Sequence, residues 1–320
     1  MSDIFFQNLG IPKPDIHLNV GSASHAVQTA KIMIAFERAI LKQKPDLVIV
    51  VGDVNSTLAC SLVASKLNIK IAHVEAGLRS FDRTMPEEIN RLVTDSLSDY
   101  LFVSEKSGLR NLGIEGIDSN KAYFVGNVMI DSLVASLPII NKSDILNELG
   151  LTCNKYSVMT LHRPSNVDSN ETLTEVFNIL SSVSREIKVV YPIHPRTEKM
   201  IRRHKFSSKF KGLDNLLLIK PLGYIDFVKL VKESKFVITD SGGIQEETTF
   251  LGVPCLTMRE NTERPVTMEE GTNYLVGRSK TRVLSCVKKI INGKSKNGSI
   301  PELWDGKTAK RIVKILWESK

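Results

Sequence analysis

Cysteine is scarce in this sequence, and its positions give no sign of a cysteine-based site. The 320 residues include four cysteines, Cys60, Cys153, Cys255 and Cys286, which are scattered and form no C-x-x-C pair. Three of them stand in or beside apolar runs, so we interpret them as small core residues in a reducing compartment. We expect no zinc site.

Long apolar runs are also absent. No apolar stretch approaches the roughly 20 residues that a membrane-spanning helix needs, and the N-terminus lacks the basic and apolar regions of a secretory signal. The composition, 42% hydrophobic and 24% charged, is typical of a soluble globular protein. We therefore expect a cytoplasmic protein without membrane contact. Its length suits two domains of about 150 residues each.

Aromatic residues are few, at 6%, and they do not interleave with the clusters of basic residues. Nucleic-acid binding is therefore not expected, because a single-strand binding surface combines basic side chains with aromatic platforms. The net charge of +8 suits a small polyanionic substrate, such as a nucleotide diphosphate, equally well.

Short apolar runs alternate with helical patterns along the chain. Strands are expected at residues 46–51, 70–74, 100–103 and 122–125, then at 156–161, 188–191, 215–219, 236–239 and 255–258, with a terminal helix from about residue 308. Apolar strands that alternate with helices form a parallel sheet covered on both faces. We predict an α/β protein with two Rossmann-like domains, residues 1–138 and 139–320. The ligand is expected in the cleft that the two domains face, outside the carboxyl ends of the strands.

The most informative stretch is residues 236–247, where an apolar run breaks at a Ser-Gly-Gly turn and continues as a helical pattern. A strand that turns through glycines into a helix points backbone N–H groups and the positive end of the helix dipole at one place. This pattern predicts a phosphate site in which Ser241 caps the helix and Glu246 or Glu247 accepts hydrogen bonds from ribose hydroxyls. An ordinary strand–turn–helix junction would give the same spacing.

Three carboxylates follow strands of the first domain. Asp53 and Glu75 come directly after two of the strands, and Glu87 or Glu88 begins a helix. Carboxylates crowded at one rim raise one another's pKa, so that one can donate a proton while another accepts. The pattern therefore predicts general acid–base chemistry.

His73 and Arg79 are expected to join these carboxylates in an acid-rich cluster on the rim. Each carboxylate also has a simpler explanation. Asp53 could cap its helix, Glu87 could favour a helix N-terminus by its charge, and Glu75 could pair with Arg79.

Cationic side chains follow the strands of the second domain. His162 and Arg163 come after the first of them, and Arg163 is a natural clamp for a diphosphate. His194 is a similar candidate, although a structural role fits it as well. Arg259 and Arg264 follow the last expected strand, and one of them is expected to face the cleft.

Taken together, seven motifs are specific enough to indicate a family. They are Gly52-Asp53, His73-Val74-Glu75-Ala76-Gly77-Leu78-Arg79, Pro86-Glu87-Glu88-Ile89-Asn90-Arg91, Val125-Gly126-Asn127, Leu161-His162-Arg163, Asp240-Ser241-Gly242-Gly243-Ile244-Gln245-Glu246-Glu247 and Thr262-Glu263-Arg264-Pro265. In this order they resemble the non-hydrolysing UDP-N-acetylglucosamine 2-epimerases. The resemblance runs from about Phe5 to the last helix.

The resemblance implies a fold of the glycosyltransferase-B type, a homodimer, and interconversion of UDP-N-acetylglucosamine and UDP-N-acetylmannosamine without a metal or nicotinamide cofactor. It implies an elimination, in which a base removes the C2 proton while UDP leaves C1, and UDP adds back after protonation of the opposite face. Carboxylates near C2 and strong stabilisation of the diphosphate serve such a route. The expected product is a precursor for surface polysaccharide.

The same resemblance assigns roles to individual positions. Asp53, Glu75 and Glu87 match the acid–base carboxylates of the family. The positions that match its UDP-binding groups are His162, Ser241, Gly242 and Gly243, with Glu247 at the ribose, Phe227 on the uracil side and Arg264 in the nucleotide cleft.

Two departures from the family pattern leave alternatives open. The sequence has nothing like the family's opening strand and Gly-Thr-Arg-Pro-Glu loop, so we expect the N-terminal βαβ segment to be lacking and the first domain to be truncated. A UDP-sugar-binding remnant without turnover is therefore an alternative, as is a glycosyltransferase that shares the fold. The stretch Pro164–Asp168 also differs from the best-known members, which allows another UDP-2-acetamido sugar, such as a diacetamido uronate, as substrate.

Overall fold

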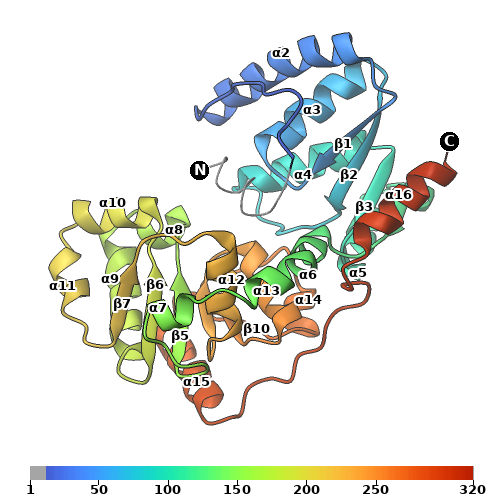
Figure 1. Cartoon of the computed structure of the whole chain (residues 1–320). Helices are drawn as coiled ribbons and strands as arrows, with labels where there is room; N and C mark the ends of the chain where they lie inside the picture. The colour runs from blue at the N-terminus through green and yellow to red at the C-terminus, as the bar shows by residue number, and fades with distance from the viewer. Residues whose placement is uncertain (1–11, 320) are drawn as a thin grey trace. The chain divides into compact units, whose positions relative to one another are not determined.

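The computed structural model describes residues 12–319 and divides into two compact units (Figure 1). The N-terminal unit comprises Pro12–Asp131 together with the chain from Glu302 onward, and the C-terminal unit comprises Ser132–Pro301. Among the described residues, none of the helices is both long and apolar enough to cross a membrane.

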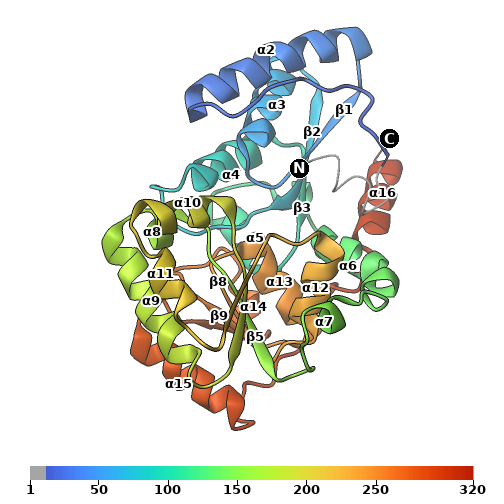
Figure 2. The ribbon, with the colours of Figure 1, turned by 60° about the vertical axis from the view of Figure 1, so that its left-hand side comes forward.

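The N-terminal unit is built on a parallel sheet with the strand order β1-β2-β3-β4. Its strands are β1 (Leu47–Val51), β2 (Lys70–Ala76), β3 (Tyr100–Val103) and β4 (Ala122–Phe124), and its helices are α2 (His25–Gln43), α3 (Asn55–Lys66), α4 (Pro86–Leu97), α5 (Lys106–Ile114) and α16 (Thr308–Glu318). Helices α2 and α3 run side by side (Figure 2) and bury Val48, Val50 and Ile71 on one face of the sheet.

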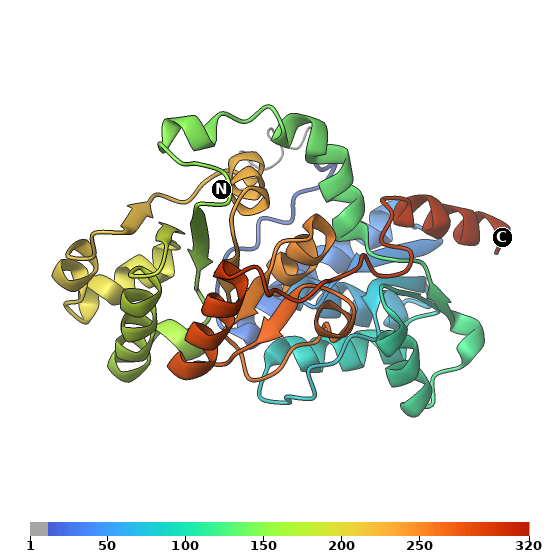
Figure 3. The same ribbon diagram turned by 90° about the horizontal axis from the view of Figure 1, so that it is seen from below.

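Helix α16 covers the opposite face of this sheet, as Figures 1 and 3 show. Ile312 packs against Ala72, Val74 and Phe102. The loop before the helix is anchored by the buried Trp304, whose indole N–H donates to the carbonyl of Ser104 over 2.9 Å. From the sequence, this helix was expected to belong to the second domain, residues 139–320. Contacts group it instead with the first sheet, because an apolar helix face covers whichever sheet face is open, regardless of its distance along the chain.

Strand β1 is at the edge of this sheet. Among residues 12–319 it pairs only with β2, and its side chains Ile49 and Val51 are each 51% exposed. An edge strand with exposed apolar side chains is a surface on which another strand can pair.

The C-terminal unit is built on a parallel sheet with the order β10-β9-β8-β5-β6-β7. Its strands are β5 (Tyr156–Thr160), β6 (Lys188–Pro192), β7 (Leu216–Ile219), β8 (Val237–Thr239), β9 (Cys255–Thr257) and β10 (Asn273–Leu275). Helices α9 (Asn170–Val183) and α15 (Lys280–Ile291) cover one face, where Leu173, Val176 and Val283 join the largest core. Helices α12 (Tyr224–Lys232) and α13 (Gly242–Leu251) contribute Val231 and Ile244 to the core of the other.

The remaining helices are short, apart from the one that links the two units. They are the 3₁₀ turn η1 (Ser119–Lys121) and the helices α6 (Val128–Ile140), α7 (Ile145–Glu148), α8 (Pro164–Val167), α10 (Pro195–Arg203), α11 (Ser207–Lys211) and α14 (Val266–Glu269). Every strand expected from the sequence is present within two residues of its expected ends. Strand β10, which has only three residues, was not expected from the sequence.

We predict that the two neighbouring residues of α16, Ile312 and Val313, differ sharply in their effect on stability. Ile312 is 6% exposed and Val313 is 64% exposed. Ile312→Ala should lower the free energy of unfolding by about 2 kcal/mol through lost burial and a residual cavity, whereas Val313→Ala should change it by less than about 0.5 kcal/mol. Urea unfolding followed by circular dichroism measures both, and equal effects would show that α16 does not pack on the sheet.

Candidate functional site

The C-terminal unit has a topological switch point between its neighbouring strands β5 and β8. The chain continues from β5 to β6 and β7 on one side of the sheet, and from β8 to β9 and β10 on the other. In open parallel sheets, ligands bind outside the carboxyl ends of the strands at such a point. His162 follows β5 and Ser241 follows β8, so the structure brings these two predicted residues to the switch point.

Asp240, at the carboxyl end of β8, connects the two strand ends. It is fully buried and accepts hydrogen bonds from the backbone N–H groups of His162 and Arg163, over 3.0 and 2.9 Å, and from the Asn166 amide over 2.9 Å. Its other oxygen lies 3.0 Å from Nδ1 of His162. Burial alone would raise the pKa of Asp240, but these donors together hold it below its usual value.

The His162 side chain is 39% exposed and is held through Nδ1, so its Nε2 is the ring nitrogen left to meet a ligand. The ring of His194 lies 5.4 Å away between centroids. Burial and the neighbouring His162 lower the pKa of His194. Nδ1 of His194 accepts the backbone N–H of Arg196 over 3.1 Å and caps α10, which is the structural role that the sequence had left open.

The predicted phosphate turn has the expected geometry, with one difference. Ser241 occupies the N-cap of α13 in an extended conformation, but its side chain makes no capping hydrogen bond. The Ser241 hydroxyl therefore does not accept a hydrogen bond from the N–H groups of the helix. The first N–H groups and the positive end of the helix dipole remain available for an anion.

Arg264 lies beneath this turn. It is 7% exposed, its Nε is 2.7 Å from Glu246, and its Nη1 donates to Glu263 over 2.6 Å. A Cβ added to Gly242 would lie 2.9 Å from Nη1 of Arg264 and 3.0 Å from Glu263. The glycine is therefore needed for this close approach. Arg259, the other candidate, is also buried and pairs with Glu263 over 2.8 Å.

The two glutamates of α13 have different surroundings. Glu246 pairs with Arg264, whereas Glu247 is 5% exposed and faces the hydroxyl of Tyr224 at the start of α12. Burial raises the pKa of Glu247 to about 7, and the hydrogen bond from Tyr224 opposes that rise. Phe227, one turn further along α12, is half-buried against the core.

In the N-terminal unit, Asp53 follows β1 after Gly52, whose φ of +70° suits glycine. Asp53 forms an ion pair with Arg91 on α4. Arg91 also donates to Glu88 over 2.9 Å. Glu88 is 2% exposed and accepts N–H groups from the loop before α4, so its role is structural.

Glu75 and Glu87 are both half-buried at the same end of the unit. Glu75 stands at an irregularity in β2, where the register with β3 shifts between Val74 and Ala76, and its φ is +71°. A left-handed conformation is strained for glutamate, and a bulge re-aims the side chain that it carries. This local strain favours a functional role for Glu75. The contrast between Glu87 and the buried Glu88 favours Glu87 as the reactive carboxylate.

His73 and Arg79 do not lie on the rim, contrary to the expectation from the sequence. His73 is fully buried, donating to Asp95 over 2.6 Å and lying 2.9 Å from the carbonyl of Gly52. Arg79 is 2% exposed and pairs with Asp95 and Glu115 over 2.7 and 2.6 Å. Buried charges are tolerated only in pairs, which explains these contacts. Through them the two residues support the turns that follow β1 and β2.

Four residues that organise these surroundings were given no role from the sequence: Asp95, Tyr224 and the motif residues Arg91 and Asp240. Burial alone would raise the pKa of Asp95, but His73 and Arg79 hold it below its usual value. Asp95 recurs at helical spacing with Glu88 and Arg91 on the buried face of α4, and this cluster of charges was a signal available in the sequence. Tyr224 gave no such signal.

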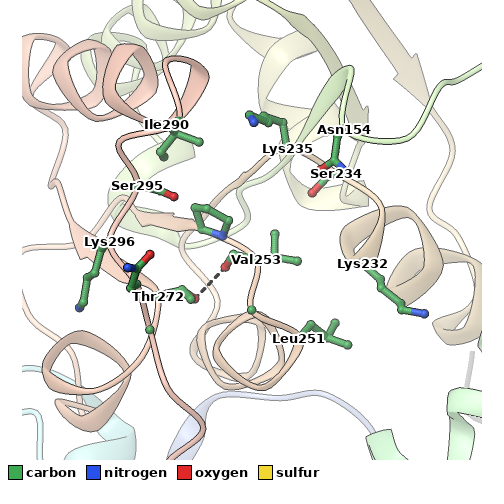
Figure 4. Close-up of a pocket in the computed structure, with 15 residues that line it drawn as sticks. Asn154, Lys232, Ser234, Lys235, Leu251, Val253, Thr272, Ile290, Ser295 and Lys296 are labelled. Carbon is green, nitrogen blue, oxygen red and sulfur yellow. Dashed lines mark hydrogen bonds between the residues drawn. The ribbon is translucent and has the colours of Figure 1, made fainter.

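A cavity of about 500 Å³ lies away from these residues, at the amino ends of β8, β9 and β10 (Figure 4). Lys235, Val253 and Thr272 line it, and the Thr272 hydroxyl donates to the Val253 carbonyl over 2.7 Å. The cavity is thus at the opposite edge of the sheet from His162 and Ser241. Within residues 12–319, no group of three or more His, Cys, Asp or Glu side chains is arranged to hold a metal ion.

Two parallel α/β units, each with polar residues at the carboxyl ends of its strands, define a protein of the glycosyltransferase-B type. A crystal structure of Methanocaldococcus jannaschii UDP-GlcNAc 2-epimerase in complex with UDP-GlcNAc and UDP superposes with a TM-score of 0.91 at 43% identity, covering 99% of this chain and 88% of that one. Residues 1–317 match the UDP-N-acetylglucosamine 2-epimerase family. The chain belongs to this family, which confirms the resemblance seen in its motifs.

Curated relatives with similar sequences are also UDP-sugar 2-epimerases. The UDP-N-acetylglucosamine 2-epimerase of Methanocaldococcus jannaschii is 44% identical over 328 residues, a match that spans 100% of this chain and 88% of the relative. A UDP-2,3-diacetamido-2,3-dideoxy-D-glucuronate 2-epimerase from Pseudomonas aeruginosa is 38% identical over 320 residues, spanning 99% of this chain and 87% of the relative.

We predict that Gly242→Ala weakens UDP binding at least 10-fold and lowers stability by about 1–3 kcal/mol, because Arg264 can move away only by giving up its buried ion pairs. Gly212→Ala is the matched control in the same unit, since its Cβ would find ordinary contacts at 3.5 and 3.6 Å. Calorimetric titration with UDP and thermal unfolding test both variants. Unchanged UDP affinity in Gly242→Ala would rule out ligand binding at this turn.

Proposed function

We propose that this chain interconverts UDP-N-acetylglucosamine and UDP-N-acetylmannosamine by inverting the configuration at C2 of the sugar. The observation that carries the proposal is that His162 and the Ser241–Gly243 turn both follow strands at the switch point of the sheet. The chain that carries them is 43% identical to an epimerase whose structure contains UDP-GlcNAc and UDP. A half-exposed histidine beside a helix N-terminus is well suited to a diphosphate.

The C2 proton of the sugar is not acidic, so the proposed route is an elimination. A carboxylate removes the C2 proton while the C1–O bond breaks and UDP departs with the bonding electrons, which leaves a glycal. A carboxylic acid then protonates C2 on the opposite face and UDP adds back to C1. The groups proposed for these proton transfers are Asp53, Glu75 and Glu87.

The C-terminal unit is proposed to hold UDP. His162, Arg163 and the turn at Ser241, Gly242 and Gly243 would bind the diphosphate, whose charge grows as the C1–O bond breaks. Glu247 would accept hydrogen bonds from the ribose, and Phe227 would lie on the uracil side. Arg264, buried with two glutamates, is proposed to contribute by supporting the turn rather than by facing solvent.

A second candidate is the same inversion on another UDP-2-acetamido sugar. The 38% identical diacetamido-glucuronate epimerase favours it, as does the Pro164–Asp168 stretch. From the family resemblance we also propose a homodimer in the cytoplasm that supplies an N-acetylmannosamine-type precursor for surface polysaccharide.

The experiment that tests the function is deuterium exchange at C2. The purified chain is incubated with UDP-N-acetylglucosamine in D2O, and the sugar is followed by NMR. Deuterium at C2 together with the manno isomer supports the proposal. UDP binding without exchange would favour a nucleotide-binding protein without turnover, and exchange only with a diacetamido uronate would favour the second candidate.

We predict that Asp53→Asn, Glu75→Gln and Glu87→Gln each slow C2 exchange by roughly 10²- to 10⁴-fold, because each removes a proposed proton-transfer group. UDP affinity should stay within about threefold of the parent, since none of these residues lies in the unit proposed to hold UDP. Glu37→Gln, an exposed position on α2, is the control and should exchange at the parental rate. A variant that keeps full exchange loses its assigned role.

We predict that UDP-sugar affinity rises with pH through about 7, the pKa of Glu247, because the ionised carboxylate accepts stronger hydrogen bonds from ribose hydroxyls. UDP-glucose is a suitable probe, since its diphosphate does not titrate in this range. The ionised buried carboxylate is also unfavourable for folding, so stability should fall as the pH rises from about 4.5 to about 7. Glu247→Gln should remove both effects, and pH-independent affinity in the parent would contradict the ribose contact.

A further inference from the structure

We propose that Asp240 is a positioning residue of the epimerisation, which holds His162 so that the imidazole Nε2 is presented to the diphosphate at the Ser241–Gly243 turn. The inference rests on the proposed function, because it assumes that an anion occupies this turn. It assigns to Asp240 a role exerted through another side chain.

The contacts of Asp240 show how one carboxylate fixes the ring. One oxygen, Oδ1, lies 3.0 Å from Nδ1 of His162. The other, Oδ2, accepts the Arg163 N–H and the Asn166 amide, each over 2.9 Å. Since Asp240 is fully buried, it cannot move to follow the ring. The ring therefore takes the orientation that the carboxylate dictates.

The proposed anion site is next to Asp240 in the chain. Ser241 directly follows Asp240, and Gly242 begins α13. Arg163 Nε donates to the Asp240 backbone carbonyl over 3.0 Å. One residue thus sets the positions of an imidazole, a guanidinium and a helix N-terminus, three groups that all attract anions.

A second His–Asp pair in the protein shows what distinguishes this one. In the N-terminal unit, His73 and Asp95 form a similar contact of 2.6 Å, but both are buried and Nε2 of His73 faces the carbonyl of Gly52. His162 is 39% exposed, and its Nε2 has no hydrogen-bond partner among residues 12–319. The same pair is therefore structural in one unit and open to a ligand in the other.

The proposed effect is electrostatic and involves no transfer of a proton by Asp240. Because Nδ1 lies 3.0 Å from the carboxylate, the ring meets the ligand through Nε2. A fixed donor aimed at the leaving diphosphate stabilises the charge that grows as the C1–O bond breaks.

Asp240→Asn tests this role while preserving most contacts. With its carbonyl oxygen at the Oδ2 position, asparagine can still accept from Arg163 and Asn166, but it places an NH₂ group against Nδ1 of His162. The contact that orients the ring is then lost, because an NH₂ group cannot accept from Nδ1–H. We expect kcat for epimerisation to fall about 100-fold, with a smaller change in KM.

A double-mutant cycle with His162→Asn separates positioning from stability. If Asp240 acts through His162, then adding Asp240→Asn to His162→Asn should lower kcat by less than about threefold. Multiplicative losses would overturn the proposal. Asp214→Asn is the control, because Asp214 is an exposed position in the same unit to which no role is assigned, and its kcat should equal that of the parent.

NMR of the parent protein with 15N-labelled histidine gives a readout that does not depend on how the variants fold. His162 should show a protonated, hydrogen-bonded Nδ1, and addition of UDP should shift its Nε2 resonance. An Nδ1 without a proton, or an Nε2 that does not respond to UDP, would overturn the proposal. If UDP shifts Nε2 but C2 exchange is absent, the proposed function fails while the positioning by Asp240 stands.

Discussion

The organisation of this protein depends on two buried aspartates, one beneath the carboxyl edge of each sheet. The turns that follow the strands of a parallel sheet are crowded at one edge. Their backbone N–H groups need acceptors once they are removed from water. Asp95 accepts the N–H of Gly77, and Asp240 accepts those of His162 and Arg163. The turns that carry the candidate functional residues therefore take their shape from these two carboxylates.

Buried ion pairs also hold the residues around these turns in place. Arg79 links Asp95 to Glu115, Arg91 links Asp53 to Glu88, and Arg264 links Glu246 to Glu263. Such pairs add little net stability, since desolvation of the charges offsets their attraction. Breaking one is nevertheless costly because a charge is left buried without its partner. The pairs therefore fix geometry, which is what a site for charged substrates requires.

The strand–helix alternation and most element boundaries could be predicted from the sequence, because apolar periodicity reports burial directly. The positions of the proposed phosphate turn and of the candidate carboxylates Asp53, Glu75 and Glu87 could also be predicted, since in a parallel sheet a strand end fixes the edge on which its next residue lies. The distinction between Glu87 and Glu88 could not be made, because which of two adjacent side chains on a helix points inward depends on what packs against the helix.

The family, the alternation of strands and helices, and the edge at which the candidate functional residues gather could all be predicted from the sequence, because they follow from local pattern and motif. Three features depend on tertiary packing: α16 covers the first sheet, His73 and Arg79 are buried, and Asp240 contacts His162. Each of these contacts joins residues far apart along the chain. Their partners are chosen by the packing of whole elements, which no local pattern records.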